Sequence, residues 1–341
     1  MEEIKDENMI RDEVKALFRP LYLIQNMFLS SKYIIHNNII RPIAYKYYLM
    51  LIFLIVLIFI FACYSAQLHI VENKESFVYS SLNIIYYIFY ASNVNNLLHV
   101  IILNMINSRN HTRFLMMIQF INGHISLSRK SSNEFIIGNW LLNLTFIFIF
   151  SVVLSVSFLG FQDINIFNFT FNILCLNLDI NLVYAIRSIV LLTKYLNLWK
   201  KCFTSTMDTQ NDKIFNTIMS ETYLTILSAY ELSSKMFITY ILLAFVTMVW
   251  TSKDLFLTIL LCLSWEKFYM AIEETEFSCL YQLARCNNTQ KSLPKNVIRY
   301  NRNVFKRTSA CGLFLVDAIL PLKLSEALTS YTIVLLQLAF L

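Results

Sequence analysis

The chain has 341 residues, of which 57% are hydrophobic and 15% are charged, and its mean hydropathy is +0.55. This composition is too apolar for a soluble domain, and the chain is too long for a single membrane anchor. The net charge of +6 comes from basic residues in short segments between apolar runs, so it does not indicate a nucleic-acid partner. We therefore expect an all-α membrane protein that crosses the lipid bilayer several times.

Residues 1–44 form a charged segment that lacks the apolar core and cleavage site of a secretory signal. We expect this segment to stay in the cytosol. Within it, the apolar run 17–28 is too short to cross a bilayer, which needs about 20 helical residues. The pattern is typical of an interfacial helix or of a helix packed against the protein.

Seven apolar runs follow, and each is a candidate membrane span. They are residues 47–66, 77–106, 135–160, 167–192, 236–250, 255–272 and 309–341. The first six place a six-helix transmembrane region at residues 45–272. The last run exceeds one crossing, so its start should lie outside the lipid.

Lysine and arginine are abundant in the amino-terminal segment and in the loops after the second, fourth and sixth spans, whereas the other loops hold only Lys74 and Lys253. Because cytosolic loops carry the excess of positive charge, the amino terminus should lie in the cytosol and the carboxyl terminus outside the cell. The stretches 193–235 and 273–308 are long and contain apolar residues at helical spacing. We expect the flanking helices to extend into the cytosol and pack together, with 273–308 as an anchor segment.

Some individual residues suggest further features. Charged residues within or beside the spans, Asp179 with Arg187 and Glu266 with Lys267, indicate ion pairing or a water-filled crevice. The seven cysteines lie in apolar runs or on the predicted cytosolic side, which favours reduced thiols. Asn168 begins a glycosylation pattern close to the membrane.

The tail contains the most specific pattern, Ser330-Tyr331, five residues at 332–336, and Gln337-Leu338. It resembles the signature of insect gustatory receptors, which is Thr-Tyr, five apolar residues and Gln-Phe, with serine and leucine as the two replacements. The residues before it also resemble the family's approach to this helix: Ala310, Cys311, Gly312, Leu313, Phe314 and Asp317.

The resemblance implies a seven-span chemosensory receptor subunit in the plasma membrane of a sensory neuron. Members of the family are ligand-gated, non-selective cation channels, so monovalent and divalent cations should permeate. They assemble as homotetramers or heterotetramers in which the last helix lines a central pore. The ligand would be a small-molecule tastant. Sugar-sensing members commonly carry an acidic residue where this chain has Thr332, so a sugar is disfavoured.

Helical spacing supports a pore at the last span. Lys323, Glu326, Ser330, Val334 and Gln337 fall on one face of a helix, and polar groups at membrane depth should meet water or a partner. We expect Gln337 to help form a ring that narrows the pore, where apolar neighbours could gate by dewetting. The candidate pore residues are Gln337, Leu338, Val334, Leu341, Ser330, Tyr331 and Glu326.

Three features of this helix have a second interpretation. Gln337 could instead form a hydrogen bond between packed helices. Glu326 either supplies negative charge to the cation path or pairs with Lys323. Pro321 removes a backbone hydrogen bond and either kinks the pore helix or forms only a packed, passive kink.

The outer halves of spans two to six are the expected ligand pocket, because small-molecule sites between helices are mostly aromatic with a few polar groups. Each of these side chains is equally compatible with an ordinary packed core. The candidates are Tyr79, Asn83, Tyr86, Tyr87, Phe150, Ser157, Phe169, Asn172, Phe245, Trp250 and Phe256, with Asn177 beside them.

Two other functions remain as alternatives. An enzyme is disfavoured because the histidines show no metal-ligand spacing and no serine lies in a nucleophile elbow, although a multi-span acyltransferase is compatible with the composition. We expect neither a metal nor a cofactor. An insect odorant receptor shares the inverted seven-span plan, but the spacing from Tyr331 to Gln337 favours the gustatory branch.

Overall fold

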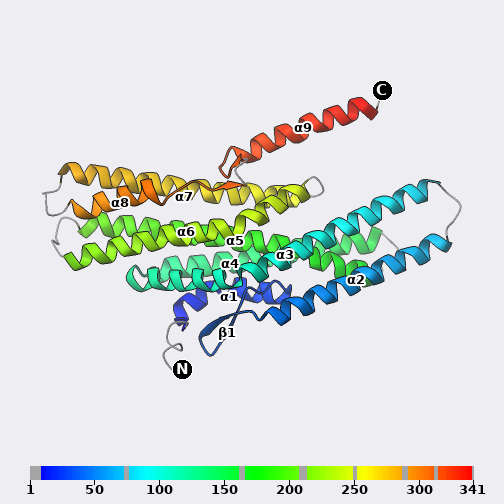
Figure 1. Ribbon diagram of the computed structural model, residues 1–341, viewed down its shortest axis with the longest axis horizontal. Coiled ribbons are helices and arrows are strands. Elements are labelled where there is room, and N and C mark those ends of the chain that lie inside the picture. Colours follow the sequence, from blue (N-terminus) through cyan, green and yellow to red (C-terminus); the bar gives the residue numbers. More distant parts are fainter. Residues whose placement is uncertain are drawn as a thin grey trace. The chain divides into compact units, whose positions relative to one another are not determined.

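The computed structural model describes residues 9–72, 77–160, 166–206, 213–248, 252–285, 291–310 and 314–339 (Figure 1). Its helices are α1 (Asp12–Met27), α2 (Tyr45–Glu72), α3 (Phe77–His124), α4 (Arg129–Gly160), α5 (Ile166–Thr206), α6 (Lys213–Met248), α7 (Ser252–Arg285), α8 (Ser292–Asn303) and α9 (Leu320–Ala339). The strands are β1 (Tyr33–His36), β2 (Ile39–Pro42), β3 (Ser309–Ala310) and β4 (Phe314–Leu315).

The chain forms two compact units, and several helices contribute to both. Unit 1 consists of Met1–Met9, Lys15–Thr112 and Ile136–Asn181, and unit 2 consists of Ile10–Val14, Arg113–Phe135 and Leu182–Leu341.

The described chain is mostly helical, as its composition predicted, and each predicted span overlaps a different helix. The helices α3, α5, α6 and α7 run well past the predicted span boundaries. In unit 2, α6, α7 and α8 pack against one another. The helices therefore extend past the spans and pack together, whereas their location in the cytosol stays a prediction.

Two strands that the sequence did not predict pair in unit 1. β1 and β2 are antiparallel, with Tyr33 opposite Pro42. Asn37 and Asn38 connect them with φ values of 50° and 60°. Two successive positive φ angles give the turn that matches the twist of a two-residue hairpin, and asparagine tolerates them well.

The helix α1 is packed and does not lie free at an interface. Leu17, Phe18 and Leu21 form a buried face. Ile24 of α1 and Phe28 just beyond its end form a hydrophobic cluster with Leu176 and Ile180 of α5. Of the two interpretations of this short apolar run, the packed helix is confirmed.

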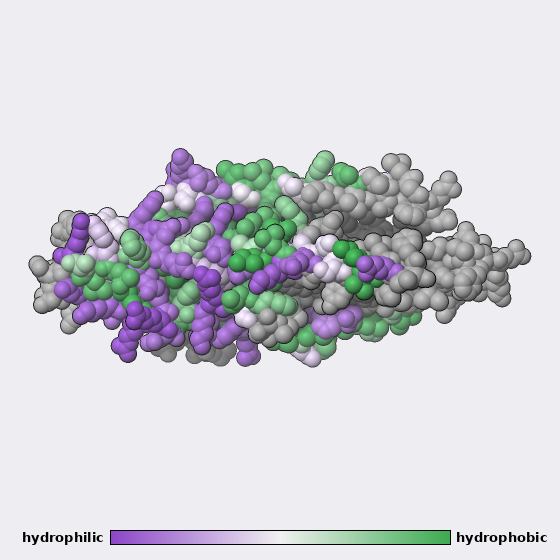
Figure 2. Space-filling model, turned by 90° about the horizontal axis from the view of Figure 1, so that it is seen from above, coloured by the Kyte–Doolittle hydropathy of each residue, from purple (hydrophilic) through white to green (hydrophobic). Residues whose placement is uncertain are grey.

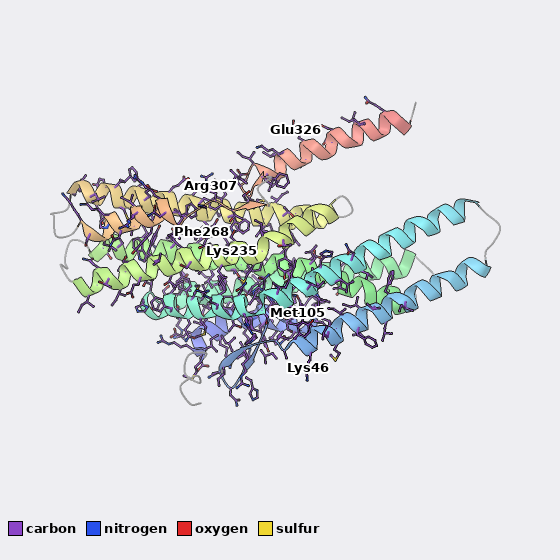
Figure 3. The ribbon with its side chains drawn as sticks, in the orientation of Figure 1. Lys46, Met105, Lys235, Phe268, Arg307 and Glu326 are labelled. Atoms are coloured by element: carbon purple, nitrogen blue, oxygen red, sulfur yellow. The ribbon has the colours of Figure 1, made fainter. Side chains whose placement is uncertain are left out.

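The helices α2 and α3 pack side by side within unit 1 (Figure 1). Leu51 and Ile55 of α2 meet Leu97 and Ile101 of α3 in one buried cluster. Met105, labelled in Figure 3, packs against the same cluster from α3.

In unit 2, aromatic and polar contacts join α5, α6 and α8. The indole of Trp199 stacks on Phe203 with ring centroids 5.1 Å apart, and its Nε1 donates a hydrogen bond of 2.9 Å to the carbonyl of Met219. Tyr223 of α6 donates to the side-chain oxygen of Asn301 on α8 at 2.5 Å. These contacts give unit 2 a packed interior.

The last helix begins later than its apolar run predicted. Residues 309–315 contain the short β3–β4 hairpin in their described part, and α9 starts at Leu320. The Asp317 carboxylate accepts the backbone N–H groups of Ile319 and Leu320, each at 3.0 Å, and so caps the helix. Pro321 therefore lies in the first turn, where its missing N–H costs nothing, and it does not kink the helix interior.

Among the described residues, one helical stretch is both long and apolar enough to cross a membrane, Leu176–Ser205, and 83% of its most apolar window is buried within the chain. Tyr45–Leu57 is a shorter apolar helical stretch. A buried core helix has the same properties, so the number of spans does not follow from this observation.

Candidate functional site

Two polar residues on α3 hold the segment that connects α1 to α2 in unit 1. Asn104 and Ser108 are buried and lie one helical turn apart. The amide of Asn104 donates to the hydroxyl of Ser30 at 3.4 Å, and the hydroxyl of Ser108 donates to the carbonyl of Lys32 at 3.1 Å. Ser108 also accepts the backbone N–H of Ile43 at 3.0 Å. Residues four apart share one helix face, so both reach the same segment.

A second pair of the same spacing lies on α4. Asn139 donates to the backbone carbonyl of Leu17 at 3.0 Å, and Asn143 donates to that of Pro20 at 2.9 Å. Both asparagines are buried. Asparagine amides commonly join helices in apolar surroundings, where a polar group needs a partner. This pair therefore fixes α1 against α4.

A third pair lies on α5. Asn177 donates to the backbone carbonyl of Phe28 at 3.3 Å, and Asn181 donates to the hydroxyl of Ser30 at 2.9 Å. Three helices thus each use two residues spaced by four to hold the amino-terminal segment. We call these residues the amino-terminal clasp: Asn104, Ser108, Asn139, Asn143, Asn177 and Asn181.

A buried lysine completes the clasp. Lys32 is fully buried, and its ammonium group donates to the side-chain oxygens of Asn104, at 2.8 Å, and Asn181. Burial lowers the pKa of Lys32 well below its usual value, because removing an ammonium group from water disfavours its charged form. The two amide oxygens take the place of the water that the ammonium group has lost.

A second buried base lies further along α3. His111 is fully buried, and its pKa is lowered well below the usual value. Desolvation is the larger cause, and the charge of Lys32 adds to it. Burial in unit 1 therefore lowers the pKa of both bases.

In unit 2, Tyr269 of α7 closes the base of the β3–β4 hairpin. Its hydroxyl accepts the backbone N–H of Thr308 at 3.1 Å and donates to the carbonyl of Val316 at 3.2 Å. The N–H of Val316 in turn donates to the carbonyl of Thr308 at 2.9 Å. We call Tyr269, Thr308 and Val316 the hairpin latch. Because α9 begins directly after it, the latch joins α7 to the approach to α9.

Neighbouring side chains reinforce the latch. The guanidinium of Arg307 donates to Glu273 at 2.7 Å and lies 5.3 Å from the ring centroid of Tyr269. The hydrogen bond to Glu273 raises the pKa of Arg307. Tyr230 of α6 stacks on Phe268, with centroids 4.5 Å apart, and Figure 3 labels Phe268 and Arg307. The hydroxyl groups of Tyr230 and Thr308 also form a hydrogen bond of 2.7 Å, so the connection between α8 and α9 is held by both α6 and α7.

The helix α4 exposes apolar side chains while it buries polar ones. Its exposed residues recur at helical spacing, and their exposed fractions include 42% for Trp140 and 68% for Phe148. Asn139 and Asn143 of the same helix are buried. In water, a helix normally exposes its polar side chains and buries its apolar ones, and α4 does the reverse. We call the exposed set the apolar stripe of α4: Ile137, Trp140, Leu141, Leu144, Phe148 and Val152.

Hydrophilic and hydrophobic residues are unevenly distributed on the face that Figure 2 draws. Toward one end the described residues are mostly hydrophilic, with some hydrophobic residues among them, and hydrophobic residues are more frequent toward the middle. Such a distribution is compatible with one zone in water and another in lipid or against a partner.

Every side chain that the structure describes in α9 after Pro321 is exposed. The predicted pore face is included, because Glu326, Ser330, Val334 and Gln337 are all exposed. No ion pair joins Glu326 to a lysine within the described part of α9, so the expected alternative of pairing at this position is not found.

The hydroxyl of Ser330 does not require a water-filled pore. It donates to the backbone carbonyl of Glu326 at 2.9 Å, so its hydrogen bond is made within the helix and does not require water. Glu326 and Gln337 are the groups for which a wet surface matters. The side chains of Tyr331 and Leu338 lie outside the described part, as does Leu341 entirely.

Most of the predicted ligand residues lie outside the described side chains, so the predicted pocket stays a prediction. Phe256 is described, and it is 61% exposed on α7. Asn177 belongs to the amino-terminal clasp. Trp250 lies outside the described residues, and so do the side chains of Tyr79, Asn83, Tyr86, Tyr87, Phe150, Ser157, Phe169, Asn172 and Phe245.

Among the charged residues within the predicted spans, the described contacts of Arg187 are with Phe135. Arg187 donates to the backbone carbonyl of Phe135 at 3.1 Å and lies 4.4 Å from the centre of its ring. Glu266 and Lys267 form no ion pair with each other in the described part of α7. No set of three or more metal-binding side chains occurs among the residues that the structure describes.

The amino-terminal clasp was missed by the sequence analysis, although a signal was present. Within or directly beside three apolar runs, Asn or Ser recurs at a spacing of four, which places both side chains on one helix face. Such a pair predicts a polar partner within the bundle. Comparison of the chain with models of known protein families gave no match, and no curated protein matched it.

Proposed function

We propose that the chain is a seven-span membrane protein and one subunit of a chemically gated, non-selective cation channel similar to insect gustatory receptors. The apolar stripe of α4 supports the membrane location, because six exposed apolar side chains at helical spacing are stable only against lipid or another protein. The buried asparagines beneath it suit a bundle that keeps its polar groups inside.

The observation that carries the channel proposal is the exposure of α9. This helix combines apolar residues such as Leu322, which is 71% exposed, with Glu326 and Gln337. In lipid, a single helix of this kind would give its apolar side chains a suitable surrounding, but it would leave the polar groups of Glu326 and Gln337 without water or a partner. Four copies around an axis would direct Glu326 and Gln337 to a water-filled path and the apolar residues to lipid or to neighbouring helices.

The ligand of this channel would be a small-molecule tastant that is not a sugar. The support is the terminal pattern from Ser330 to Leu338, together with Thr332. Assembly as a homotetramer or heterotetramer and a plasma-membrane location follow from the same resemblance.

The test measures ligand-evoked current and assembly in heterologous cells. The wild-type chain should form tetramers in detergent and carry cations when an effective tastant is applied. Gln337→Ala should change relative permeability or gating. Thr329→Ala is the matched control, because its hydroxyl bonds to the carbonyl of Ser325 within the helix, at 2.8 Å, and lies away from the proposed pore face. A monomeric chain, or a tetramer whose permeation Gln337→Ala leaves unchanged, would contradict the pore assignment.

A further inference from the structure

The helix α8 is amphipathic and has one basic face. Its buried side, which includes Val297 and Ile298, packs in unit 2 with α6 and α7. Lys295, Arg299 and Arg302 are exposed at positions i, i+4 and i+7, which place them on one face of the helix. Lys306 is exposed just beyond the end of α8. We call Lys295, Arg299, Arg302 and Lys306 the basic face of α8.

The charge of this face is not neutralised within the described chain. Glu273 pairs with Arg307, and Glu274 pairs with Lys200 at 2.5 Å. No residue of the basic face forms an ion pair with a described residue. The sequence between 291 and 316 also contains no aspartate or glutamate. Four positive charges are therefore available to a partner.

Contacts with α7 place the basic face close to the predicted membrane boundary. The chain after α8 returns along α7, because Asn301 donates to Glu276 at 3.5 Å and Arg307 pairs with Glu273. The sixth predicted span ends at residue 272. Glu276 is four residues beyond that boundary, which corresponds to about 6 Å of helix. On the predicted topology, Arg302 and Lys306 would therefore lie at the depth of lipid headgroups, and Lys295 would lie about 10 Å further into the cytosol.

We propose that the basic face of α8 docks on anionic phospholipid headgroups, phosphoinositides above all, in the cytosolic leaflet. The inference rests on the proposed membrane topology. Clusters of four to eight lysines and arginines directly beside a membrane span are the pattern that binds such headgroups. A partner that grips an amphipathic helix through its apolar side is disfavoured, because Val297 and Ile298 are buried against the rest of unit 2.

The contributions of the four residues should be unequal. Attraction to a charged surface decays over a Debye length, about 8 Å at physiological ionic strength. Neutralising Arg302 or Lys306 should therefore weaken binding more than neutralising Lys295. If the basic face were only solvated and bound no lipid, the effect of neutralising a residue on lipid binding would not depend on its position along α8.

The experiment uses the full chain purified in neutral detergent and native mass spectrometry to count bound lipids. Wild type should bind phosphatidylinositol bisphosphate and retain little phosphatidylcholine. Arg299→Gln/Arg302→Gln/Lys306→Gln should lower the affinity by about tenfold or more, since each basic residue near the surface contributes on the order of 1 kcal/mol. The matched control is Arg113→Gln/Lys201→Gln/Arg285→Gln, which removes the same charge from exposed residues that lie at least seven residues, about 10 Å of helix, beyond the predicted spans.

Three outcomes would overturn the docking surface. These are unchanged lipid binding by the α8 variant, an equal loss in the control variant, and equally tight binding of soluble inositol trisphosphate, which would indicate a soluble ligand. Lipid binding is measured without recording ion current, so the result does not depend on channel activity. If the chain binds lipid but forms no tetramer, the docking surface stands and only the channel proposal is contradicted. If the chain stays in solution without detergent, the membrane topology on which both proposals rest is contradicted.

Discussion

The ammonium group of Lys32 donates a hydrogen bond of 2.8 Å to the side-chain oxygen of Asn104, although 72 residues separate the two along the chain. Both side chains are buried. A charge in such a position requires polar partners at fixed places, because no water is available to replace them. The contact therefore ties the position of the amino-terminal segment to that of α3.

Replacing Lys32 by methionine should destabilise the chain. The variant keeps most of the side-chain volume but leaves the amide oxygens of Asn104 and Asn181 without the donor that they now share, at a cost of about 1–3 kcal/mol. Thermal unfolding in detergent should show a lower midpoint. Lys46→Met is the control, because Lys46 is exposed on α2 (Figure 3). Equal midpoints for the two variants would show that the ammonium group is not needed.

The stability of unit 1 should fall in mild acid because of His111. Its folded pKa is lowered, so the unfolded chain binds more protons as the pH decreases from about 6.5 toward the folded pKa. Stability is thus greatest above that range and is lost as His111 becomes protonated. His111→Gln should flatten the dependence of the unfolding midpoint on pH between about 6.5 and 5. The exposed His36, replaced by glutamine, should leave the slope unchanged.

The sequence predicted the helices better than it predicted their partners. Apolar runs near the length of a bilayer crossing identified the segments that become α2 to α7. The start of α9 could not be predicted in this way, because residues 309–319 are as apolar as the helix that follows. What stops the helix there is the cap at Asp317 and the contact of the preceding hairpin with Tyr269, which is distant in sequence.

The amino-terminal clasp illustrates the same limit. Asn177 appeared as a candidate ligand residue because a polar group in an apolar helix needs a partner, and composition does not reveal which one. Its partner is the carbonyl of Phe28, 149 residues away. The proposed pore face of α9 was predicted without any distant partner, because spacing along one helix defines it.

Removing the hydroxyl of Tyr269 should loosen the approach to α9. Tyr269→Phe keeps the ring but deletes the hydrogen bonds to Thr308 and Val316, and each is worth about 0.5–1.5 kcal/mol. Hydrogen exchange of the amides at 308 and 316 should therefore become roughly tenfold faster, since 1.4 kcal/mol is a factor of ten.

The control for this change is Tyr223→Phe. That hydroxyl holds Asn301 of α8 and does not contact the hairpin latch, so its removal should affect exchange in α8 and spare residues 308–316. Faster exchange of the latch in both variants would indicate a general loosening of unit 2. If the channel proposal is also correct, Tyr269→Phe should shift the tastant concentration that half-activates the current.

Trp140 provides a direct test of whether lipid covers the apolar stripe of α4. Its indole is 42% exposed, whereas Trp199 and Trp265 are fully buried. In vesicles of brominated phospholipid, which quench indoles on contact, Trp140 should contribute most of the quenched fluorescence among these three residues. Trp140→Phe should remove that component, and Trp199→Phe should not. If quenching survives Trp140→Phe unchanged, another protein surface must cover the stripe, since six exposed apolar side chains at helical spacing would not remain in water.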